Sequence, residues 1–347
     1  MIQRWLAFFV ALGLLLAGCA AGTTGAHASA APAPVEPTRV RTLSLAAQTE
    51  LSAAAEKGLD CFVRRVAELS DGALTVKITQ SNDPIDALDE GCDLMFAPND
   101  VIARANGNFN SYTSPFYFAD YKHLSLSLNS ESFQKLTGDA TGSLLGAQSI
   151  GAFYDGNSVM VTIREEMLDT LDQFKGLKIY IGENALLEEM LTDPTLVGAE
   201  VTIRTPDARI AGWNSGRCQT IECDTAALTR LDMPDKRTHL NLSETFHAAR
   251  INWMMLSNHP TQPLTEWERA VITEAVAYAI AANDHAVLAA EQAGLEHMKE
   301  LGCSFYAPNH SEFCEATDKI LTANAKFNNL WDWELHALVR KLPSEVD

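Results

Sequence analysis

The sequence predicts an α/β protein with two lobes and one long helix that spans both of them. Residues 41–97 alternate between strand and helix patterns, which is typical of a doubly wound α/β lobe. The chain has 347 residues, 47% of them hydrophobic, so it is long enough to form two separate cores. A helical pattern runs from residue 265 to 301, and a helix of this length measures roughly 55 Å, which exceeds the width of one lobe.

The elements of the first lobe follow from their apolar spacing. Alternation with a period of two predicts strands, whereas apolar residues three and four positions apart predict helices. In chain order, the expected elements are a strand at 41–47, a helix at 49–69, a strand at 74–79, a helix at 85–91 and a buried strand at 93–97.

The rest of the chain continues this alternation. The expected elements are two short strands within 150–162 around a turn at Asp155-Gly156, a strand at 177–181 after a turn at Gly176, a helix at 184–191, a strand at 200–203, a helix at 206–213, the long helix and a final helix at 311–330. Thr265 and Glu268 have the spacing of a capping box at the start of the long helix, and Gly302 is expected to end it.

The first residues indicate an export signal rather than part of the fold. Arg4 supplies a positive charge, residues 5–16 form an apolar segment too short to span a bilayer, and Leu16-Ala17-Gly18-Cys19 matches a bacterial lipobox. We therefore expect residues 1–18 to be removed as a signal peptide and Cys19 to carry a lipid anchor. An ordinary secretory signal that is cleaved elsewhere is the alternative interpretation.

The stretch after the lipobox has the composition of a flexible tether. Residues 19–38 are rich in Ala, Gly, Ser, Thr and Pro and cannot bury a core. The protein is then expected in the periplasm, held on a bacterial membrane only by its lipid. Ala20 stands where an Asp is associated with retention in the inner membrane, which favours the outer membrane.

The cysteine count suggests disulfides, because an even number remains after Cys19 in an exported chain. The spacing favours three pairs, which are Cys61 with Cys92, Cys218 with Cys223, and Cys303 with Cys314. The sequence has no C-x-x-C motif, which disfavours a zinc ribbon or a thioredoxin-type site. We expect no metal and no cofactor.

Charge and motifs exclude several classes of function. The formal net charge is −19, and an acidic protein repels phosphate backbones, so nucleic acid is not an expected partner. The sequence lacks the G-x-S-x-G, P-loop, G-x-G-x-x-G and H-E-x-x-H motifs. Cys223 and His247 are a candidate nucleophile and base, but a disulfide to Cys218 is the expected fate of that thiol. We therefore expect a binding protein rather than an enzyme.

Several segments carry a family resemblance when they are taken in order. They are residues 70–76 (S-D-G-A-L-T-V), 90–96 (E-G-C-D-L-M-F), 114–124 (S-P-F-Y-F-A-D-Y-K-H-L), 171–181 (L-D-Q-F-K-G-L-K-I-Y-I) and the stretch 247–269. Together they resemble the solute-binding proteins of TRAP-type (DctP-like) transporters. The resemblance implies a two-lobed fold like the type II periplasmic binding proteins, with a hinged cleft. It places lobe 1 at 39–153 plus 247–285 and lobe 2 at 154–246 plus 286–335.

The resemblance also implies a function. Such a protein captures a small organic solute outside the cytoplasm and delivers it to the membrane subunits of a TRAP-type transporter. The alternative is an anchored sensor or scaffold lipoprotein that keeps the fold and has no role in transport.

This sequence departs from the family at the residues that bind the ligand. In the family, the segment ending at 180 closes with an Arg that grips the carboxylate of the ligand, and Tyr180 stands there in this chain. Asn157 and Ser158 replace a second ligand-binding Arg. Because a bidentate Arg–carboxylate contact is among the strongest polar contacts, we expect a neutral, cationic or aromatic ligand rather than a simple monocarboxylate.

The candidate ligand-binding residues come from the segments that the resemblance places around the cleft. Residues 211–224, where the family has a D-G pair and a proline, form a rebuilt wall. If the ligand is an anion, Arg209 and Arg217 lead the substitutes for the missing arginines, ahead of Arg164 and Arg204. The full set of candidates is Tyr154, Asn157, Tyr180, Arg209, Trp213, Arg217, Glu222, Asp224 and His247.

Overall fold

The computed structural model describes residues 40–144, 146–233 and 239–342. The expected signal peptide, Cys19 and the tether lie outside these residues. Within the described ranges, we find no helix with the length and apolar character that crossing a membrane requires. The fold is α/β with two separate sheets, as the sequence predicts.

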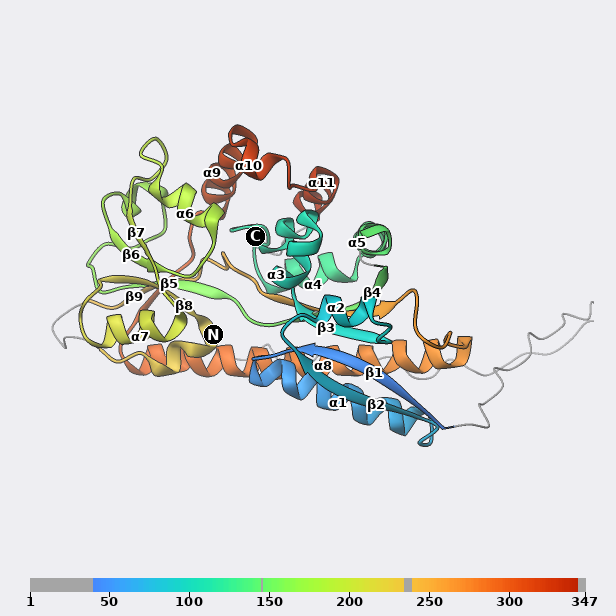
Figure 1. Cartoon of the computed structure of the whole chain (residues 1–347). Coiled ribbons are helices and arrows are strands. Elements are labelled where there is room, and N and C mark those ends of the chain that lie inside the picture. The colour runs from blue at the N-terminus through green and yellow to red at the C-terminus, as the bar shows by residue number, and fades with distance from the viewer. Residues whose placement is uncertain (1–39, 145, 234–238, 343–347) are drawn as a thin grey trace, which may run out of the picture. The chain divides into compact units, whose positions relative to one another are not determined.

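Lobe 1 is built on a five-stranded sheet with the strand order β2-β1-β3-β10-β4 (Figure 1). Strands β1, β2 and β3 are parallel, whereas β10 runs antiparallel to both β3 and β4. The bounds of the strands are β1 Arg41–Gln48, β2 Leu74–Ser81, β3 Leu94–Pro98, β4 Ala147–Tyr154 and β10 Ile251–Ser257. The helices of this lobe are α1 Ala53–Leu69, α2 Pro84–Asp89, α3 Asn99–Ala105, α4 Tyr121–Asn129 and α5 Glu131–Leu144, with a 3-10 helix η1 at Gly107–Thr113.

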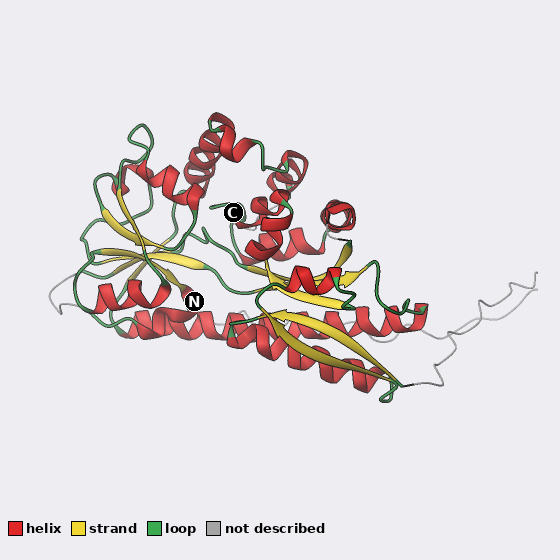
Figure 2. Cartoon of the chain, in the orientation of Figure 1, coloured by secondary structure: helices red, strands yellow, loops and turns green. Residues whose placement is uncertain are grey.

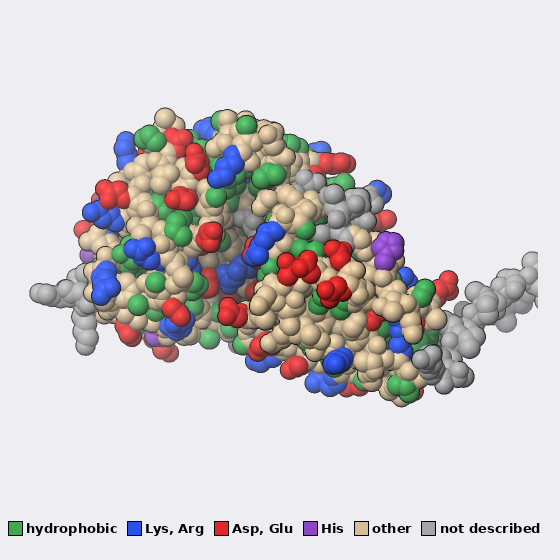
Figure 3. Space-filling model, viewed as in Figure 1, with side chains coloured by type: hydrophobic (Ala, Val, Ile, Leu, Met, Phe, Trp, Pro, Cys, Tyr) green, Lys and Arg blue, Asp and Glu red, His purple; other side chains and the backbone are tan. Residues whose placement is uncertain are grey.

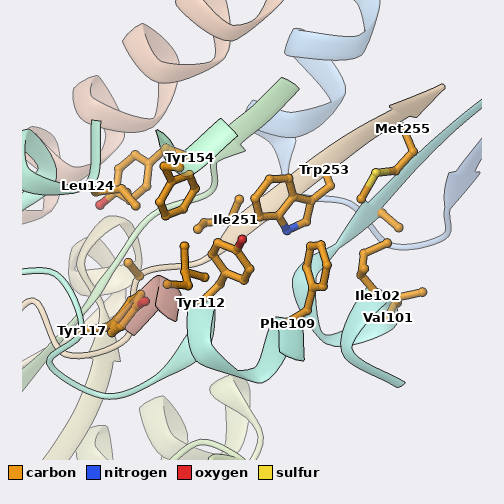
Figure 4. Close-up of a cluster of buried hydrophobic side chains, with 14 of the residues drawn as sticks. Val101, Ile102, Phe109, Tyr112, Tyr117, Leu124, Tyr154, Ile251, Trp253 and Met255 are labelled. Carbon is orange, nitrogen blue, oxygen red and sulfur yellow. The ribbon is translucent and has the colours of Figure 1, made fainter. Parts of the chain in front are cut away.

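Both faces of the lobe 1 sheet bury a core. On one face, Phe62 of α1 packs with the strands and with the long helix. On the other face, Trp253 packs edge-on against Tyr112 and Phe109, with ring centroids 5.0 and 5.4 Å apart (Figure 4). Burial of this kind on both faces explains why β3 and β10 read as continuous apolar runs rather than as alternating strands.

Lobe 2 is built on a six-stranded sheet with the strand order β11-β9-β5-β8-β6-β7. Strand β6 is parallel to β7 and β8, and β5 runs antiparallel to β8 and β9. The bounds are β5 Ser158–Thr162, β6 Lys178–Ile181, β7 Glu200–Ile203, β8 Thr220–Asp224, β9 Asn241–Ser243 and β11 Ser304–Tyr306. Helices α6 Ala185–Thr192, α7 Pro206–Asn214 and α9 His310–Ala323 belong to this lobe, with 3-10 helices η2 at Leu171–Phe174 and η3 at Thr225–Arg230.

The long helix α8, Glu266–Glu300, packs against elements of both lobes (Figures 1 and 2). Its first half lies along α1 and its last turns lie along η3. The predicted capping box is confirmed, because Thr265 Oγ1 accepts from the N–H of Glu268 at 3.2 Å and Glu268 Oε2 accepts from the N–H of Thr265 at 2.7 Å. Gly302 follows the helix with φ of +82°, a conformation that suits glycine at a helix end.

The end of the chain differs from the single final helix that the sequence predicts. Helix α9 ends at Ala323, a short helix α10 covers Ala325–Asn328, and helix α11 covers Trp333–Lys341. Leu335 and Val339 of α11 belong to the apolar cluster around Trp253, so the chain returns to lobe 1. The division of the chain into lobes at residues 153, 246 and 285 stays a prediction.

The structure also differs from the predicted disulfide pairing, because it holds all six cysteines after Cys19 as free thiols. Cys218 precedes β8 and Cys223 lies within it, and both are buried as free thiols in the core of lobe 2. The thiol of Cys314 donates to Phe116 O at 3.2 Å, whereas that of Cys303 donates to Ser304 O at 3.4 Å. Cys61 and Cys92 likewise face the carbonyls of different neighbours, Tyr278 and Ser44. The even number of cysteines and their short spacing in the sequence do not reveal that each thiol lies in a separate environment.

The close contact between α8 and η3 yields a first prediction. A Cβ atom added to Gly294 would lie 2.0 Å from the backbone O of Thr225, so Gly294→Ala forces the helix away from η3. We expect this substitution to lower the free energy of unfolding by about 1–3 kcal/mol. Gly138 of α5 is the matched control, because a Cβ there meets no atom within 4 Å and Ala is the better helix former. Urea unfolding that gives equal stability changes for the two variants would contradict the packing argument.

Candidate functional site

A cleft of about 580 Å³ lies where the chain passes between the two sheets. The carboxyl ends of β3, β6, β7 and β8 and the amino end of β10 meet at this cleft, which is where ligands bind in open α/β sheets. Figure 3 shows Lys and Arg side chains at the boundary between the two halves. The lining includes Asn99, Asp100 and Asn252 from lobe 1 and Glu183, Glu222 and Asp224 from lobe 2.

Another cavity of about 400 Å³ lies in lobe 1, between α4, α5, β4 and α8. Its lining is mostly apolar and contains no residue of lobe 2. A ligand in it would contact only one lobe, so the cleft between the sheets is the better candidate for the functional site.

The floor of the cleft is formed by two carboxylates on β8. Because side chains alternate along a strand, Ile221 and Cys223 enter the core of lobe 2 while Glu222 and Asp224 face the cleft. Glu222 is only 5% exposed. Its Oε2 accepts from the N–H of Gly182 at 2.5 Å, at the end of the neighbouring strand β6.

Two cationic or basic side chains complete the surroundings of Glu222. Arg209 Nη1 lies 3.8 Å from Glu222 Oε2, and Arg209 itself is only 5% exposed. Thr205 caps the first turn of α7 and Pro206 opens it, which fixes the start of the helix from which Arg209 reaches back. On the other side, His247 Nε2 lies 3.5 Å from Glu222 Oε1, and His247 Nδ1 lies 2.5 Å from Thr245 Oγ1.

These neighbours keep Glu222 ionised. Burial by itself favours the neutral acid, but His247, Arg209 and the N–H of Gly182 outweigh it and lower the pKa of Glu222 to about 2. The buried floor of the cleft therefore carries a negative charge that is balanced from inside the protein.

Asp224 and Arg250 form a second ion pair beside the first. Asp224 Oδ1 accepts from Arg250 Nη1 at 2.7 Å and from Ser158 Oγ at 3.1 Å, and Arg209 Nη2 lies 4.0 Å away. Arg250 Nη2 donates to the backbone O of Asp155 at 2.9 Å. Each of these two arginines is thus already matched by a carboxylate of the chain.

The crossing from β4 to β5 lies directly behind this pair. Gly156 has φ of +95°, and a Cβ atom there would lie 2.7 Å from Arg250 Nη2, so only glycine allows the guanidinium to approach. Glu291 of α8 accepts from the hydroxyl of Tyr154 at 2.8 Å and from the N–H of Asn157 at 2.9 Å. The long helix therefore holds the residues on both sides of the crossing.

Comparison with known proteins agrees with this geometry. Residues 46–202 match the model of the family described as bacterial extracellular solute-binding protein, family 7. A TRAP periplasmic solute-binding protein from Ochrobactrum anthropi superposes with a TM-score of 0.70 at 18% identity, covering 87% of this chain and 96% of that one. The expected resemblance is thereby confirmed: residues 46–202 match this family, and the fold of the chain is that of TRAP periplasmic solute-binding proteins. No curated protein matches it.

Other solved members of this family share the fold at similar distance. The apo open structure from Escherichia fergusonii has a TM-score of 0.70 at 16% identity, covering 87% of this chain and 99% of that one. The protein from Chromohalobacter salexigens with bound D-glucuronate has a TM-score of 0.64 at 16% identity, covering 86% and 99%. The two-lobed fold expected from the resemblance is thereby confirmed.

Four of the residues predicted to bind the ligand gather at the cleft. Arg209, Glu222 and Asp224 line it, and His247 lies behind Glu222 with no exposed surface. Of the two arginines predicted to replace the family's arginine, which is Tyr180 in this chain, Arg209 lines the cleft. Whether these residues bind a ligand stays a prediction.

The other five predicted residues do not line the cleft. Trp213 is fully buried in the core of lobe 2 and donates its indole N–H to Asp232 O at 2.7 Å. Tyr180 packs against Gly212 and beneath the guanidinium of Arg204, while Arg217 is exposed beyond the end of α7. Tyr154 and Asn157 face Glu291 at the crossing. The expected stacking of an aromatic ligand on Tyr154, Tyr180 and Trp213 therefore has no support in the geometry of the cleft.

Sequence reasoning missed Arg250, Asp155, Glu183 and Asn252, all of which line the cleft. Arg250 and Asn252 lie on either side of Ile251, the first residue of strand β10. Because β10 runs antiparallel to β3, its start lies beside the carboxyl end of β3, and both ends line the cleft together with the carboxyl end of β8. The sequence contains a signal for this, because Arg250 and Asn252 stand at the start of a stretch that is otherwise apolar as far as Leu256. Within the described residues, no group of three or more His, Cys, Asp and Glu side chains is arranged to hold a metal ion.

The buried pairing predicts how stability depends on pH. Replacing Glu222 by Gln should destabilise the protein by about 3 kcal/mol at neutral pH, because Arg209 loses its nearest counter-charge. The pKa of Glu222 is lowered to about 2 in the folded protein, so the stabilisation is complete above the usual range for Glu and is lost as the pH falls towards 2. The difference between wild type and Glu222→Gln should therefore shrink in urea unfolding between about pH 4.5 and pH 2.

Glu183→Gln is the matched control for this measurement, because Glu183 is an exposed carboxylate of the same cleft. We expect its stability to stay within about 0.5 kcal/mol of wild type. A Glu222→Gln variant as stable as this control at neutral pH would contradict the assigned role of the buried carboxylate.

Proposed function

We propose that this protein captures a small organic solute in the cleft between its lobes and delivers it to the membrane subunits of a TRAP-type transporter. The observation that carries this proposal is the origin of the polar groups, because Asn252 and Asp100 approach the cleft from lobe 1 and Glu222 and Asp224 from lobe 2. A ligand that contacts both sets binds the closed arrangement better than the open one and so shifts the population towards closure.

The size of the cleft suits a small solute. Its volume of about 580 Å³ lies in the range of ordinary small-molecule sites. The family members from Chromohalobacter salexigens and Polaromonas sp. bind D-glucuronate and D-erythronate, which are solutes of this size. The family binds solutes and does not transform them, so we propose no catalytic role.

The alternative is an anchored sensor or scaffold that keeps the fold and has no transport role. One observation favours it, namely that Arg209 and Arg250, two of the three arginines that line the cleft, are each already paired with a carboxylate of the chain. The two candidates differ in whether the cleft binds any solute at all, so ligand binding separates them.

The membrane anchor is the finer part of the proposal. The family is extracytoplasmic, and we propose that the mature chain begins at a lipidated Cys19 and is tethered by residues 19–38. The outer membrane is the preferred location, on the argument from Ala20.

A screen of solutes against the protein without its lipid tests the proposed function. A ligand present at a thousand times its dissociation constant should add about 4 kcal/mol to the free energy of unfolding, which raises the melting temperature by several degrees. Closure of the lobes should at the same time reduce the radius of gyration in X-ray scattering. A well-folded protein that responds to no organic acid, amine, sugar or amino acid would favour the sensor or scaffold alternative.

The anchor has its own test. Cys19→Ser should abolish labelling by radioactive palmitate and move the protein from the membrane fraction to the soluble periplasmic fraction, because the thioether lipid can no longer form. Cys92→Ser is the matched control, since Cys92 lies inside the folded region. A wild-type protein without label would show that the signal peptide is of the ordinary secretory type, and label that persists in Cys19→Ser would show that the lipid is attached to another residue.

A further inference from the structure

The cleft contains a carboxylate of the chain in a place that is built to hold one. Three groups converge on Glu222, namely the N–H of Gly182, the guanidinium of Arg209 and the ring of His247. A backbone N–H together with a guanidinium is a good set of donors for any carboxylate. Here Glu222 occupies it, and with 5% exposure it leaves no room for a second carboxylate from solution.

The charge that remains in the cleft is negative. Its lining holds five carboxylates, of Asp100, Asp155, Glu183, Glu222 and Asp224, and three guanidinium groups, of Arg204, Arg209 and Arg250, which gives a net charge of −2. An anionic solute that enters this cleft meets like charges, whereas a cation is attracted.

One of these carboxylates has an oxygen to spare. Among the residues that the structure describes, the hydrogen bonds and ion pairs of the Asp224 carboxylate are all made through Oδ1, with Arg250, Ser158 and the more distant Arg209. Its side chain is 27% exposed, so Oδ2 faces the cleft. A carboxylate oxygen in this position is a hydrogen-bond acceptor for an ammonium group.

A polar group on the opposite wall also lacks a partner. Asn252 on β10 is 1% exposed and lines the cleft, and its Nδ2 has no hydrogen-bond partner in the described structure. A buried amide N–H₂ without an acceptor is costly, so a bound solute that supplies a hydroxyl or carbonyl oxygen there is favoured.

We propose that the ligand is a small organic cation, an ammonium compound that also carries a hydroxyl or carbonyl oxygen, and that Glu222 replaces the ligand carboxylate from within the chain. Asp224 Oδ2 accepts from the ammonium group of the ligand, and Asn252 donates to its oxygen. This inference rests on the proposed function, since it names the class of solute that the cleft captures.

A panel of probes of matched shape and different charge tests the ligand class. D-glucosamine, D-glucose and D-glucuronate share one ring and carry positive, zero and negative charge, and the panel adds primary amines, quaternary ammonium compounds and organic acids. We expect amines to raise the melting temperature of the wild-type protein and acids to leave it unchanged. Asp224→Asn should weaken the binding of the best amine roughly tenfold or more, as measured by calorimetry.

The outcomes of this panel separate the two proposals. Stabilisation by acids and not by amines overturns the cationic ligand and leaves solute capture in place. Stabilisation by no member of the panel overturns solute capture itself. Lys178→Ala, on the exposed edge of β6 away from the cleft lining, is the control for Asp224→Asn and should bind the same amine unchanged.

The replacement of the ligand carboxylate has a separate test that needs no knowledge of the ligand. Glu222→Ala leaves a cavity lined by Gly182 N–H, Arg209 and His247, so acetate added at rising concentration should enter it and restore part of the lost melting temperature. Glu183→Ala in the same cleft should gain nothing from acetate over chloride. A Glu222→Ala variant that gains no more from acetate than this control overturns the replacement.

A second variant serves if Glu222→Ala does not fold. Glu222→Gln keeps the shape of the side chain and removes its charge, so the cleft loses one negative charge and Arg209 loses its nearest counter-charge. We therefore expect this variant to bind D-glucuronate more tightly than wild type does, through attraction of the anion to the cleft rather than its entry into the place of Glu222. Equal or weaker binding of D-glucuronate by Glu222→Gln overturns the proposal, and this measurement is independent of the amine panel.

Discussion

The packing of α8 against both lobes is the constraint on which the rest of the structure depends. The helix contributes apolar side chains to the cores of both lobes, and its buried Asn283 donates to the backbone O of Tyr154 at 2.6 Å where the chain leaves β4. About two helical turns further on, Glu291 accepts from the N–H of Asn157 on the other side of the same crossing. A helix is stiff over this length, so the crossing segment rather than α8 is the place where the lobes can rotate.

The electrostatics of the cleft follow from where this arrangement brings β6, β8 and α7 together. A buried ion pair of the kind formed by Glu222 and Arg209 adds little net stability, since desolvation of both charges offsets their attraction. Removing one partner, however, leaves a buried charge without compensation and costs about 3–5 kcal/mol. Such a pair therefore fits a role in selecting what enters the cleft better than a role in holding the lobe together.

Much of the fold was predictable, because local patterns carry it. Alternation located β1 and β2, a short apolar run located β3, and the capping box at Thr265 located the start of α8 to the residue. The return of α11 to lobe 1 was not predictable, since Leu335 and Val339 have the spacing of an ordinary amphipathic helix and nothing in that spacing names the surface they cover. The free state of the six cysteines was not predictable either, because the separation of two cysteines along the sequence does not give their distance in the fold.

The site shows the same division. Order and spacing of motifs indicated the family, the two lobes and the segments that surround the cleft. Strand β8 was not predicted, and only the fold shows that its alternation places Glu222 and Asp224 on one face. Which arginine reaches them depended on how α7 lies against β6, which turned Arg209 inward and left Arg217 in solvent. The partners of Glu222 stand far apart along the chain and meet only when strands, helix and crossing segment pack together. Charge pairing needs contact within a few ångströms, and only the packed fold sets distances on that scale.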